Sequence, residues 1–178
     1  MIRNVVFDVG NVLVKLHYQP FIQYLGRAGV DMADLPRWLS QVDLEGHERG
    51  DVPGEVLLGR IAGMATRPLN LDELRTHWLS MFEPWDEMFT LASGLKADYR
   101  VYLLSNIGDM HWAHLDSLYG LDALVHGACA SFRVGAIKPH VVQLHLAHVG
   151  MVRRVILGDD DERLVLQLHF RPLEPRRA

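Results

Sequence analysis

The sequence contains a single cysteine, has no surplus of positive charge and has no long apolar run. Cys129 alone cannot form an internal disulfide, which is typical of reducing compartments. The formal net charge of −4 gives no electrostatic reason to expect nucleic acid or an anionic membrane as a partner. No apolar stretch is long enough to span a bilayer, and the first residues lack the apolar segment of a secretory signal. We therefore expect a cytoplasmic protein.

The apolar content is sufficient for a sizeable core. Hydrophobic residues make up 49% of the 178 residues and charged residues 22%, as in a globular chain and not in a disordered one. This length fits one domain, or one core domain with a modest insertion. A small anionic substrate would need a local cationic site in a chain of this net charge.

A short apolar run near the N-terminus ends in an aspartate, Asp8. The β-branched and aromatic residues Val5–Phe7 predict a buried strand of a parallel sheet, followed by Asp8 and a turn at Gly10-Asn11. Ligands of open α/β sheets bind at the carboxyl ends of such strands, so Asp8 is a candidate catalytic residue. The alternative is an aspartate that only caps the following turn.

Residues 15–85 show apolar positions at helical spacing, interrupted by prolines and glycines. This pattern predicts several short helices inserted as a cap, with residues 1–14 and 86–178 forming the core domain. Within the cap, His47 and Glu48 are titratable residues at a helix end. These two residues either belong to the site or lie at a solvated helix terminus.

Three further polar signals follow at strand or helix ends. A strand over 100–104 leads into Ser105-Asn106, which suits phosphate binding because the turn points donors outward, or is only a turn. Lys138-Pro139 precedes a helix over 141–148. A strand over 154–158 ends in four consecutive acids, Asp159 to Glu162, which predict either a Mg²⁺ site or an acidic helix start. Helices over 84–96 and 109–119 and a short strand near Val125 lie between these signals.

In this order, with a helical insertion after the first, the motifs resemble those of the haloacid dehalogenase-like (HAD) hydrolase superfamily, over residues 1 to about 163. The segments Phe-Asp-Val-Gly-Asn-Val-Leu, His-Glu-Arg-Gly, Leu-Leu-Ser-Asn and Lys-Pro are most similar to the branch that contains alpha-D-glucose-1-phosphate phosphatase. The resemblance implies an α/β fold with a Rossmann-like three-layer parallel sheet, an inserted helical cap and a shortened C-terminal part.

The resemblance also implies a Mg²⁺-dependent phosphatase of a small phosphorylated metabolite, such as a sugar phosphate. Asp8 would be the nucleophile that forms an aspartyl-phosphate. Lys138 would be catalytic and bind phosphate together with Ser105 and Asn106. The metal ligands would be Asp8, the Gly10 carbonyl and Asp159, with Asp160, Asp161 or Glu162 as alternatives to Asp159.

Three departures from the superfamily pattern stand out. Gly10 replaces the second aspartate that usually supplies general acid and base, so His47 or Glu48 is a candidate replacement. Arg163 occupies the position of an expected acid or amide after the metal aspartate. The few residues after the last motif contain two prolines and clustered arginines, which do not predict the further strand that relatives have.

These departures leave two rival interpretations open. The first is a degenerate, catalytically weak member that binds phosphate or a protein, and the second is a metal-free haloacid dehalogenase, against which the retained Asp159 counts. The uncovered last strand further predicts a homodimer or a marginally stable monomer. The apolar patch that would decide between these two states consists of Leu164, Leu166, Leu168 and Phe170.

Overall fold

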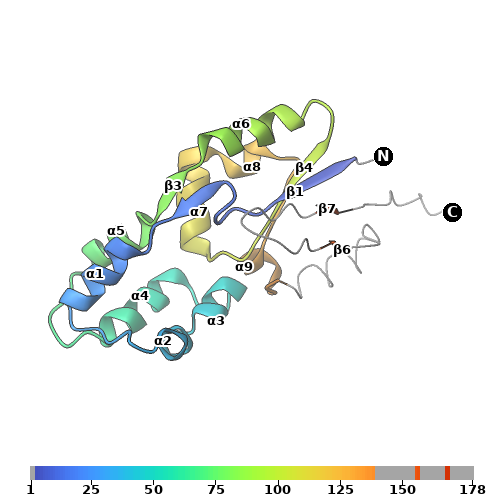
Figure 1. The fold of residues 1–178 in the computed structure, drawn as a ribbon. Coiled ribbons are helices and arrows are strands. Elements are labelled where there is room, and N and C mark those ends of the chain that lie inside the picture. The colour runs from blue at the N-terminus through green and yellow to red at the C-terminus, as the bar shows by residue number, and fades with distance from the viewer. Residues whose placement is uncertain (1–2, 139–154, 157–166, 169–178) are drawn as a thin grey trace, which may run out of the picture.

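The computed structural model describes residues 3–138, 155–156 and 167–168, and within them the chain forms a mixed α/β fold around a parallel sheet (Figure 1). The order of the three strands in this sheet is β1-β4-β5. In register, Val5 lies opposite Val101 and Tyr102 opposite Gly127. The strands are β1 (Asn4–Phe7), β4 (Arg100–Ser105) and β5 (Gly127–Ala130).

Three helices connect these strands, and they lie on the same side of the sheet (Figure 1). Both crossovers move along the sheet in the same direction, so the right-handed rule for parallel connections places their helices on one face. The helix over 109–119 has the bounds that the sequence predicted. The helices are α6 (Asp86–Leu95), α7 (Asp109–Tyr119) and α8 (Leu121–Leu124).

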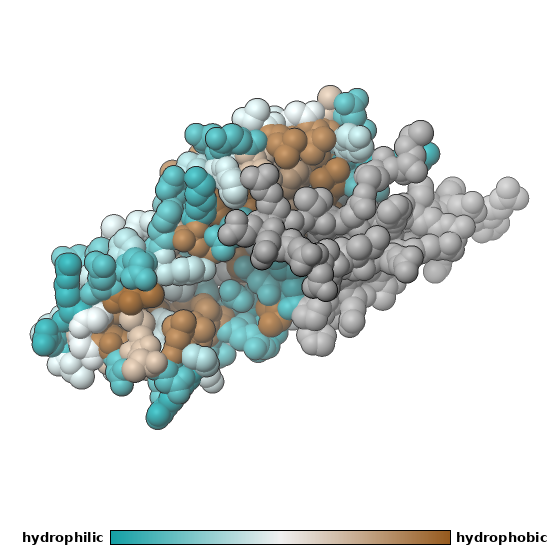
Figure 2. All heavy atoms as spheres, viewed as in Figure 1, coloured by the Kyte–Doolittle hydropathy of each residue, from teal (hydrophilic) through white to brown (hydrophobic). Residues whose placement is uncertain are grey.

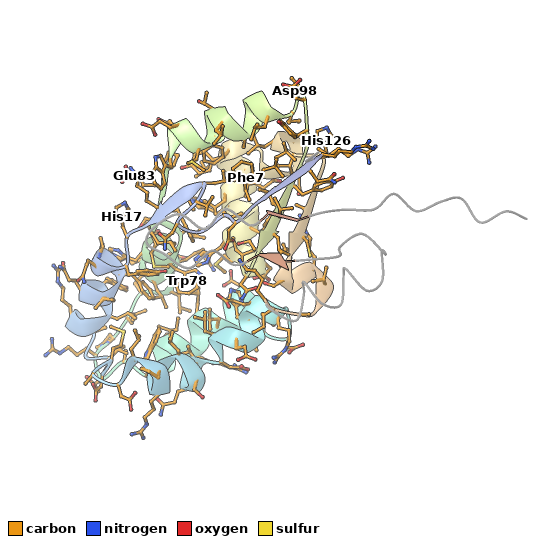
Figure 3. All side chains as sticks on the ribbon, turned by 45° about the vertical axis from the view of Figure 1, so that its right-hand side comes forward. Phe7, His17, Trp78, Glu83, Asp98 and His126 are labelled. Carbon is orange, nitrogen blue, oxygen red and sulfur yellow. The ribbon has the colours of Figure 1, made fainter. Side chains whose placement is uncertain are left out.

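A hydrophobic core fills the space between the sheet and these helices. Phe7 projects from β1 into it (Figure 3), and Leu103 of the central strand and Leu115 of α7 are at most 1% exposed. Burying side chains of this kind contributes roughly 1.5–3 kcal/mol each. The sheet therefore holds its carboxyl edge, where Asp8 and Ser105 lie, on a well-packed base.

Five helices occupy the predicted cap and form a group beyond the sheet (Figure 1), and one of them, over 71–79, packs against α7. They have a hydrophobic cluster of their own, in which Leu25, Leu57 and Leu74 are fully buried. In Figure 2 apolar residues also reach the surface over this group. We propose on this basis that residues 15–85 form the cap as a unit. The helices are α1 (Gln19–Arg27), α2 (Leu35–Val42), α3 (Leu44–Arg49), α4 (Gly54–Gly63) and α5 (Leu71–Leu79).

Short polar side chains set where these helices begin. Asp34 accepts from the Arg37 N–H (3.1 Å) at the start of α2, and Asp43 accepts from the Gly46 N–H (3.1 Å) at the start of α3. Asn70 Oδ1 likewise accepts from the Asp72 N–H (2.8 Å) at the start of α5. Such caps satisfy backbone donors that the first helical turn leaves free, which explains several short helices in place of one long one. None of the described helices is long and apolar enough to cross a membrane.

The cap is joined to the core by a two-stranded antiparallel sheet that the sequence analysis missed. Strands β2 (Val14–Leu16) and β3 (Phe82–Pro84) pair with Leu16 opposite Phe82. At its surface His17 Nε2 lies 2.8 Å from a Glu83 carboxylate oxygen, and Figure 3 labels both residues. The expectations of helical structure from residue 15 and of a helix that starts at residue 84 are wrong, because three-residue strands are too short to show a period.

The strand predicted over 154–158 also differs from the expectation. Strand β6 (Val155–Ile156) pairs antiparallel with β7 (Gln167–Leu168) in a sheet of its own, and does not extend the parallel sheet. Residues 167–168 thus form a strand after the last motif, whereas the ending with two prolines and clustered arginines, for which no strand was predicted, lies outside the described residues. The predicted helix over 141–148, and the homodimer with its patch of Leu164, Leu166, Leu168 and Phe170, lie outside the described side chains.

Candidate active site

The candidate site lies at the carboxyl edge of the parallel sheet, where Asp8 follows β1 and Ser105 ends β4. Lys138 reaches this edge from the turn after α9 (Ser131–Val134). Its Nζ donates to Asp8 Oδ2 and lies 3.4 Å from the Leu104 carbonyl oxygen. The two side chains are 28% and 30% exposed, so the ion pair is partly shielded from water. Residues 130 positions apart thus form one charge pair.

Asn106 fixes the approach of Lys138. Its Oδ1 accepts from the Lys138 backbone N–H at 2.7 Å, which ties the lysine turn to the exit of β4. The sequence analysis expected Asn106 to contact phosphate and did not foresee this contact. Within the described part of the chain, the Asn106 backbone N–H donates to no oxygen. The side chain of Asn106 therefore positions Lys138, and its backbone N–H remains available to an anion.

The turn after β1 orients Asp8 and exposes a carbonyl. The Val9 N–H donates to Asp8 Oδ1 (2.7 Å), and the Val9 carbonyl accepts from Leu13 (2.9 Å) and Val14 (3.0 Å). Asn11 takes a left-handed conformation (φ 55°) that closes this turn. Among the described residues no donor reaches the Gly10 carbonyl oxygen. The turn thus places one free backbone oxygen beside the Asp8 carboxylate.

Ser105 is buried at the same edge. Its side chain is 3% exposed, and its hydroxyl has no hydrogen-bond partner among the described residues. Buried polar groups are rarely left without a partner, so a free hydroxyl at a strand exit is a donor for a ligand. Ser105 lines a cavity in front of the sheet, together with Asn106.

Helix α3 brings Glu48 of the cap to this edge through contacts that the sequence did not reveal. Ser131 Oγ is fully buried, donates to the Glu48 carbonyl (2.5 Å) and accepts from the Ile107 N–H (2.9 Å). Gly50 has a φ of 88°, and a Cβ there would lie 2.4 Å from the Phe132 carbonyl oxygen. This close approach requires glycine and lets α3 pack on α9. A serine directly after a buried strand was the available signal for Ser131.

The Glu48 carboxyl group has a perturbed titration. Burial raises its pKa, the Lys138 charge lowers it, and the nearby Glu45 and Asp8 carboxylates raise it, with a net upward shift. Burial and the Glu48 charge also raise the pKa of Tyr18. Because the charges of Asp8 and Lys138 both act on Glu48, this residue lies close to the candidate site, as the sequence analysis suggested.

His47 has a different environment. It is 1% exposed, its Nδ1 donates to the Val52 carbonyl at 2.8 Å, and a Cβ on Gly108 would lie 2.0 Å from its Nε2. The alternative interpretation of a solvated helix terminus is therefore wrong for this residue. Because one ring nitrogen is held by the backbone and the ring is enclosed, His47 is the weaker candidate for proton transfer.

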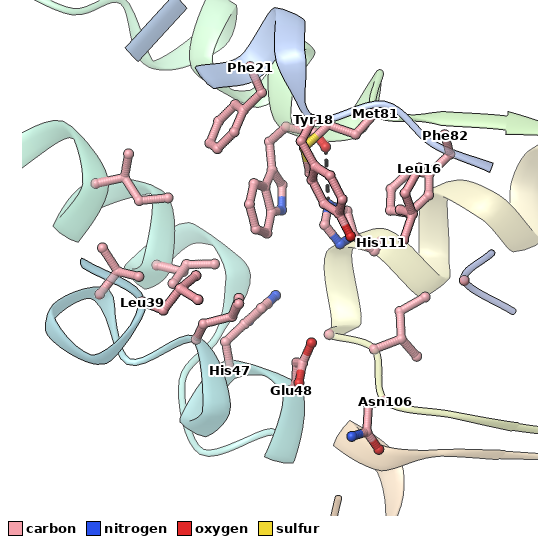
Figure 4. Close-up of a pocket in the computed structure, with 18 of the residues that line it drawn as sticks. Leu16, Tyr18, Phe21, Leu39, His47, Glu48, Met81, Phe82, Asn106 and His111 are labelled. Carbon is pink, nitrogen blue, oxygen red and sulfur yellow. Dashed lines mark hydrogen bonds between the residues drawn. The ribbon is translucent and has the colours of Figure 1, made fainter. Parts of the chain in front are cut away.

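A cavity of about 520 Å³ opens between the cap and the edge of the sheet (Figure 4). Glu48 and Asn106 lie at one end of it, and Phe21 and Leu39 lie at the opposite end. Asp8 and Lys138 do not line this cavity themselves, but Gly10 and Ser105, which flank them, do. A cavity of this size holds a small molecule whose anionic group would contact the sheet edge.

The donors for a divalent cation are described only in part. The Asp8 carboxylate and the free Gly10 carbonyl are hard oxygen ligands of the kind that Mg²⁺ prefers, and they fit such an ion. Within residues 3–138, no group of three or more His, Cys, Asp or Glu side chains could hold a metal. The predicted ligands Asp159 and Asp160, and Arg163, lie outside the described residues.

Comparison with known proteins adds sequence and structural relatives, although no family model matches the chain. The chain is 30% identical over 148 residues to D-ribitol-5-phosphate phosphatase from Bacteroides thetaiotaomicron, covering 78% of this chain and 72% of that protein.

Among solved structures, a HAD family enzyme from the same organism superposes with a TM-score of 0.73 at 20% identity, covering 84% of this chain and 79% of that one. A predicted HAD-like family hydrolase from Porphyromonas gingivalis gives 0.65 at 27% identity, covering 85% and 78%. The α/β fold class is thereby confirmed, whereas the narrower resemblance to the branch of alpha-D-glucose-1-phosphate phosphatase stays a prediction. The sequence relative and the shared fold together place the chain in the haloacid dehalogenase-like hydrolase superfamily.

Proposed function

We propose that the chain is a Mg²⁺-dependent phosphatase that hydrolyses a small phosphorylated molecule through an aspartyl-phosphate. The observation that carries the proposal is the contact between the Lys138 ammonium and the Asp8 carboxylate, next to the free Ser105 hydroxyl. The related D-ribitol-5-phosphate phosphatase supports the reaction class. A structure of the HAD family enzyme with magnesium and inorganic phosphate, superposing with a TM-score of 0.72, supports the ion.

In the first step the Asp8 carboxylate attacks phosphorus. The new bond joins an Asp8 oxygen to phosphorus, and the bond from phosphorus to the leaving oxygen breaks. Lys138 offsets the repulsion between the carboxylate and the phosphate, while the Ser105 hydroxyl and the Asn106 N–H donate to phosphoryl oxygens. In the second step water attacks the same phosphorus, which releases phosphate and restores the Asp8 carboxylate.

The metal would be held by Asp8, the Gly10 carbonyl and Asp159. A bound Mg²⁺ supplies positive charge that stabilises the charge developing on the transferring phosphoryl group. Lys138 cannot supply this alone, since its charge is already balanced by Asp8.

Proton transfer is the role that Gly10 leaves open, and we assign it to Glu48. The Glu48 carboxyl gives its proton to the leaving oxygen in the first step, and the resulting carboxylate takes a proton from the attacking water in the second. Burial favours the protonated form that the first step requires, because it raises the pKa of this group. The charges that act on Glu48 come from Lys138, Asp8 and Glu45, and Tyr18 is affected by Glu48 in return.

Replacing Glu48→Gln is expected to lower turnover of alkyl phosphates by about 10²- to 10⁴-fold, the usual contribution of a positioned acid and base. The wild-type rate should fall as pH rises through the raised pKa of Glu48, and the variant should lack this decline. Acetyl phosphate, whose leaving group needs no proton, should be affected far less. Rates measured against pH for both substrates test the assignment.

A control variant and a stability measurement exclude a structural cause. Glu87→Gln changes an exposed residue of α6 that is not among the groups acting on Glu48, and it should leave the pH profile unchanged. A carboxyl with a raised pKa contributes stability at low pH that is lost as pH rises through that pKa, so Glu48→Gln should have a Tm at or above wild type at neutral pH. Equal loss of activity on both substrates, or an unchanged pH profile, would contradict the role of Glu48.

Phosphate release from a panel of phosphate monoesters, with added Mg²⁺ and after chelation, tests the proposed function itself. We expect turnover that requires Mg²⁺ and is restored by adding it back. Hydrolysis of 2-chloropropionate without metal would instead identify a dehalogenase. Binding of phosphate without turnover of any ester would identify a degenerate member.

A further inference from the structure

The two ends of the cavity differ in chemistry. Figure 4 shows Asn106 and Glu48 at the sheet end and residues such as Phe21 and Leu39 at the cap end. Ser105, the last residue of β4, also lines the cavity. Among the described lining residues, Glu48 is the sole aspartate, glutamate, lysine or arginine. Once the sheet end holds a phosphoryl group, the rest of the substrate extends into a space with almost no charge.

An aromatic cluster forms one wall of this space. Trp78 stacks on His111 with ring centroids 4.3 Å apart, and Phe21 and Phe82 contact this pair at 5.3 and 4.6 Å. Burial lowers the pKa of His111 to about 3, so the ring is neutral at physiological pH. Its Nε2 donates to the Trp78 carbonyl at 3.1 Å, so this N–H is not available to a ligand. The wall therefore offers aromatic surface and not charge.

Within the described part of the chain, four buried side-chain nitrogens have no hydrogen-bond partner. Three belong to residues that line the cavity, namely Nε1 of Trp38, Nε1 of Trp78 and Nε2 of His47, and the fourth is Nε1 of Trp112. These nitrogens have almost no accessible surface, so they are closed to a ligand, and the polar groups beyond the sheet end that remain for one are few, such as the Tyr18 hydroxyl and the Gln19 amide. These few groups cannot pair with a hydroxyl group on every carbon of a polyol.

We infer that the leaving group of the substrate is an uncharged, largely apolar alcohol with a hydrocarbon or aromatic body and few polar atoms. This inference rests on the proposed phosphatase function and names the substrate class for the same site. It separates the chain from its relative, whose substrate by name is the phosphate of a polyol. A polyol in this cavity would lose its hydration without new partners, whereas an apolar body gains from leaving water.

The cavity also has room for such a group. Its volume of about 520 Å³ exceeds what a phosphoryl group alone requires and lies within the range of small-molecule sites. In hydrophobic pockets one methylene group changes kcat/KM by roughly 10- to 200-fold. A preference for the apolar ester should therefore be large enough to measure.

The test compares 2-phenylethyl phosphate with ribitol 5-phosphate on the full chain with Mg²⁺. Both are monoesters of primary alcohols, so the comparison isolates what the leaving group contacts. We expect kcat/KM for 2-phenylethyl phosphate to be higher by about tenfold or more. Acetyl phosphate serves as a third substrate, because its small leaving group reports phosphatase chemistry without using the cap end of the cavity.

A cavity variant and its control complete the design. Leu39→Gln places an amide in the cap end and should reduce the preference, while Leu71→Gln, at a 50% exposed position of α5 that does not line the cavity, should preserve it. A preference for ribitol 5-phosphate, or equal rates for the two esters, would overturn the proposed substrate class. Turnover of acetyl phosphate in the same experiment would still support the phosphatase function. Failure of all three substrates would overturn the proposed function together with this inference.

Discussion

Replacing Asp8→Asn is expected to abolish hydrolysis, with a loss on the order of 10⁴-fold or more, as for removal of other enzymatic nucleophiles. The amide has the shape of the carboxylate but cannot attack phosphorus. It also leaves Lys138 without its anionic partner, although the Val9 N–H can still donate to the amide oxygen. Steady-state turnover of acetyl phosphate and of an alkyl phosphate measures the loss.

The control for this prediction is Asp98→Asn, which makes the same chemical change at an exposed position far from the cavity (Figure 3). It should retain full activity. Thermal unfolding and circular dichroism of both variants show whether they remain folded. Turnover within tenfold of wild type in a folded Asp8→Asn protein would remove Asp8 from the mechanism.

Replacing Lys138→Ala is expected to lower turnover by about 10²- to 10³-fold, the range seen when one preorganised donor to a developing charge is removed. Without the ammonium group, the Asp8 carboxylate and the phosphate dianion repel each other. Vanadate or inorganic phosphate should therefore also bind more weakly, which isothermal titration measures separately from chemistry.

Two further variants keep this prediction specific. Lys138→Met retains the length of the side chain and should lose as much activity as Lys138→Ala, since charge and not volume is responsible. Lys15→Met changes a lysine that is 46% exposed on β2 and should have no effect on phosphate binding. Wild-type phosphate affinity in the Lys138 variants would show that this lysine serves only to hold Asp8.

That Asp8 and Ser105 lie at one edge could be predicted from the sequence, whereas the contact of Lys138 with Asp8 was expected only from the family resemblance. Parallel strands end at a common edge, so polar residues at the exits of neighbouring strands lie together. The helix over 109–119 was equally predictable, because its apolar period extends over three turns. Local pattern and the regular geometry of a sheet were sufficient for both.

The remaining features depend on contacts that no local pattern encodes. Ser131 contacts the Glu48 carbonyl across 83 positions, and Gly50 is required by a neighbour, Phe132, that belongs to another helix. The burial of His47 follows from the docking of α3, since its own segment is polar and predicts exposure. Strands β2 and β3 escape prediction because each is too short for a period and only their mutual pairing stabilises them.

The pairing of β2 with β3 affects how such a chain can change over evolution. Because Leu16 lies opposite Phe82, the chain leaves the core and returns to it at one point, and everything between these residues is, for the core, a single closed loop. The entropy of closing a loop grows only with the logarithm of its length, by about 0.6 kcal/mol for each doubling. An inserted segment of another length or sequence, fastened by the same two short strands, would therefore cost the core little. The phosphate-handling edge could stay unchanged while the substrate-facing segment is exchanged as a whole, and new specificities could arise by recombination at residues 16 and 82 without redesign of the chemistry.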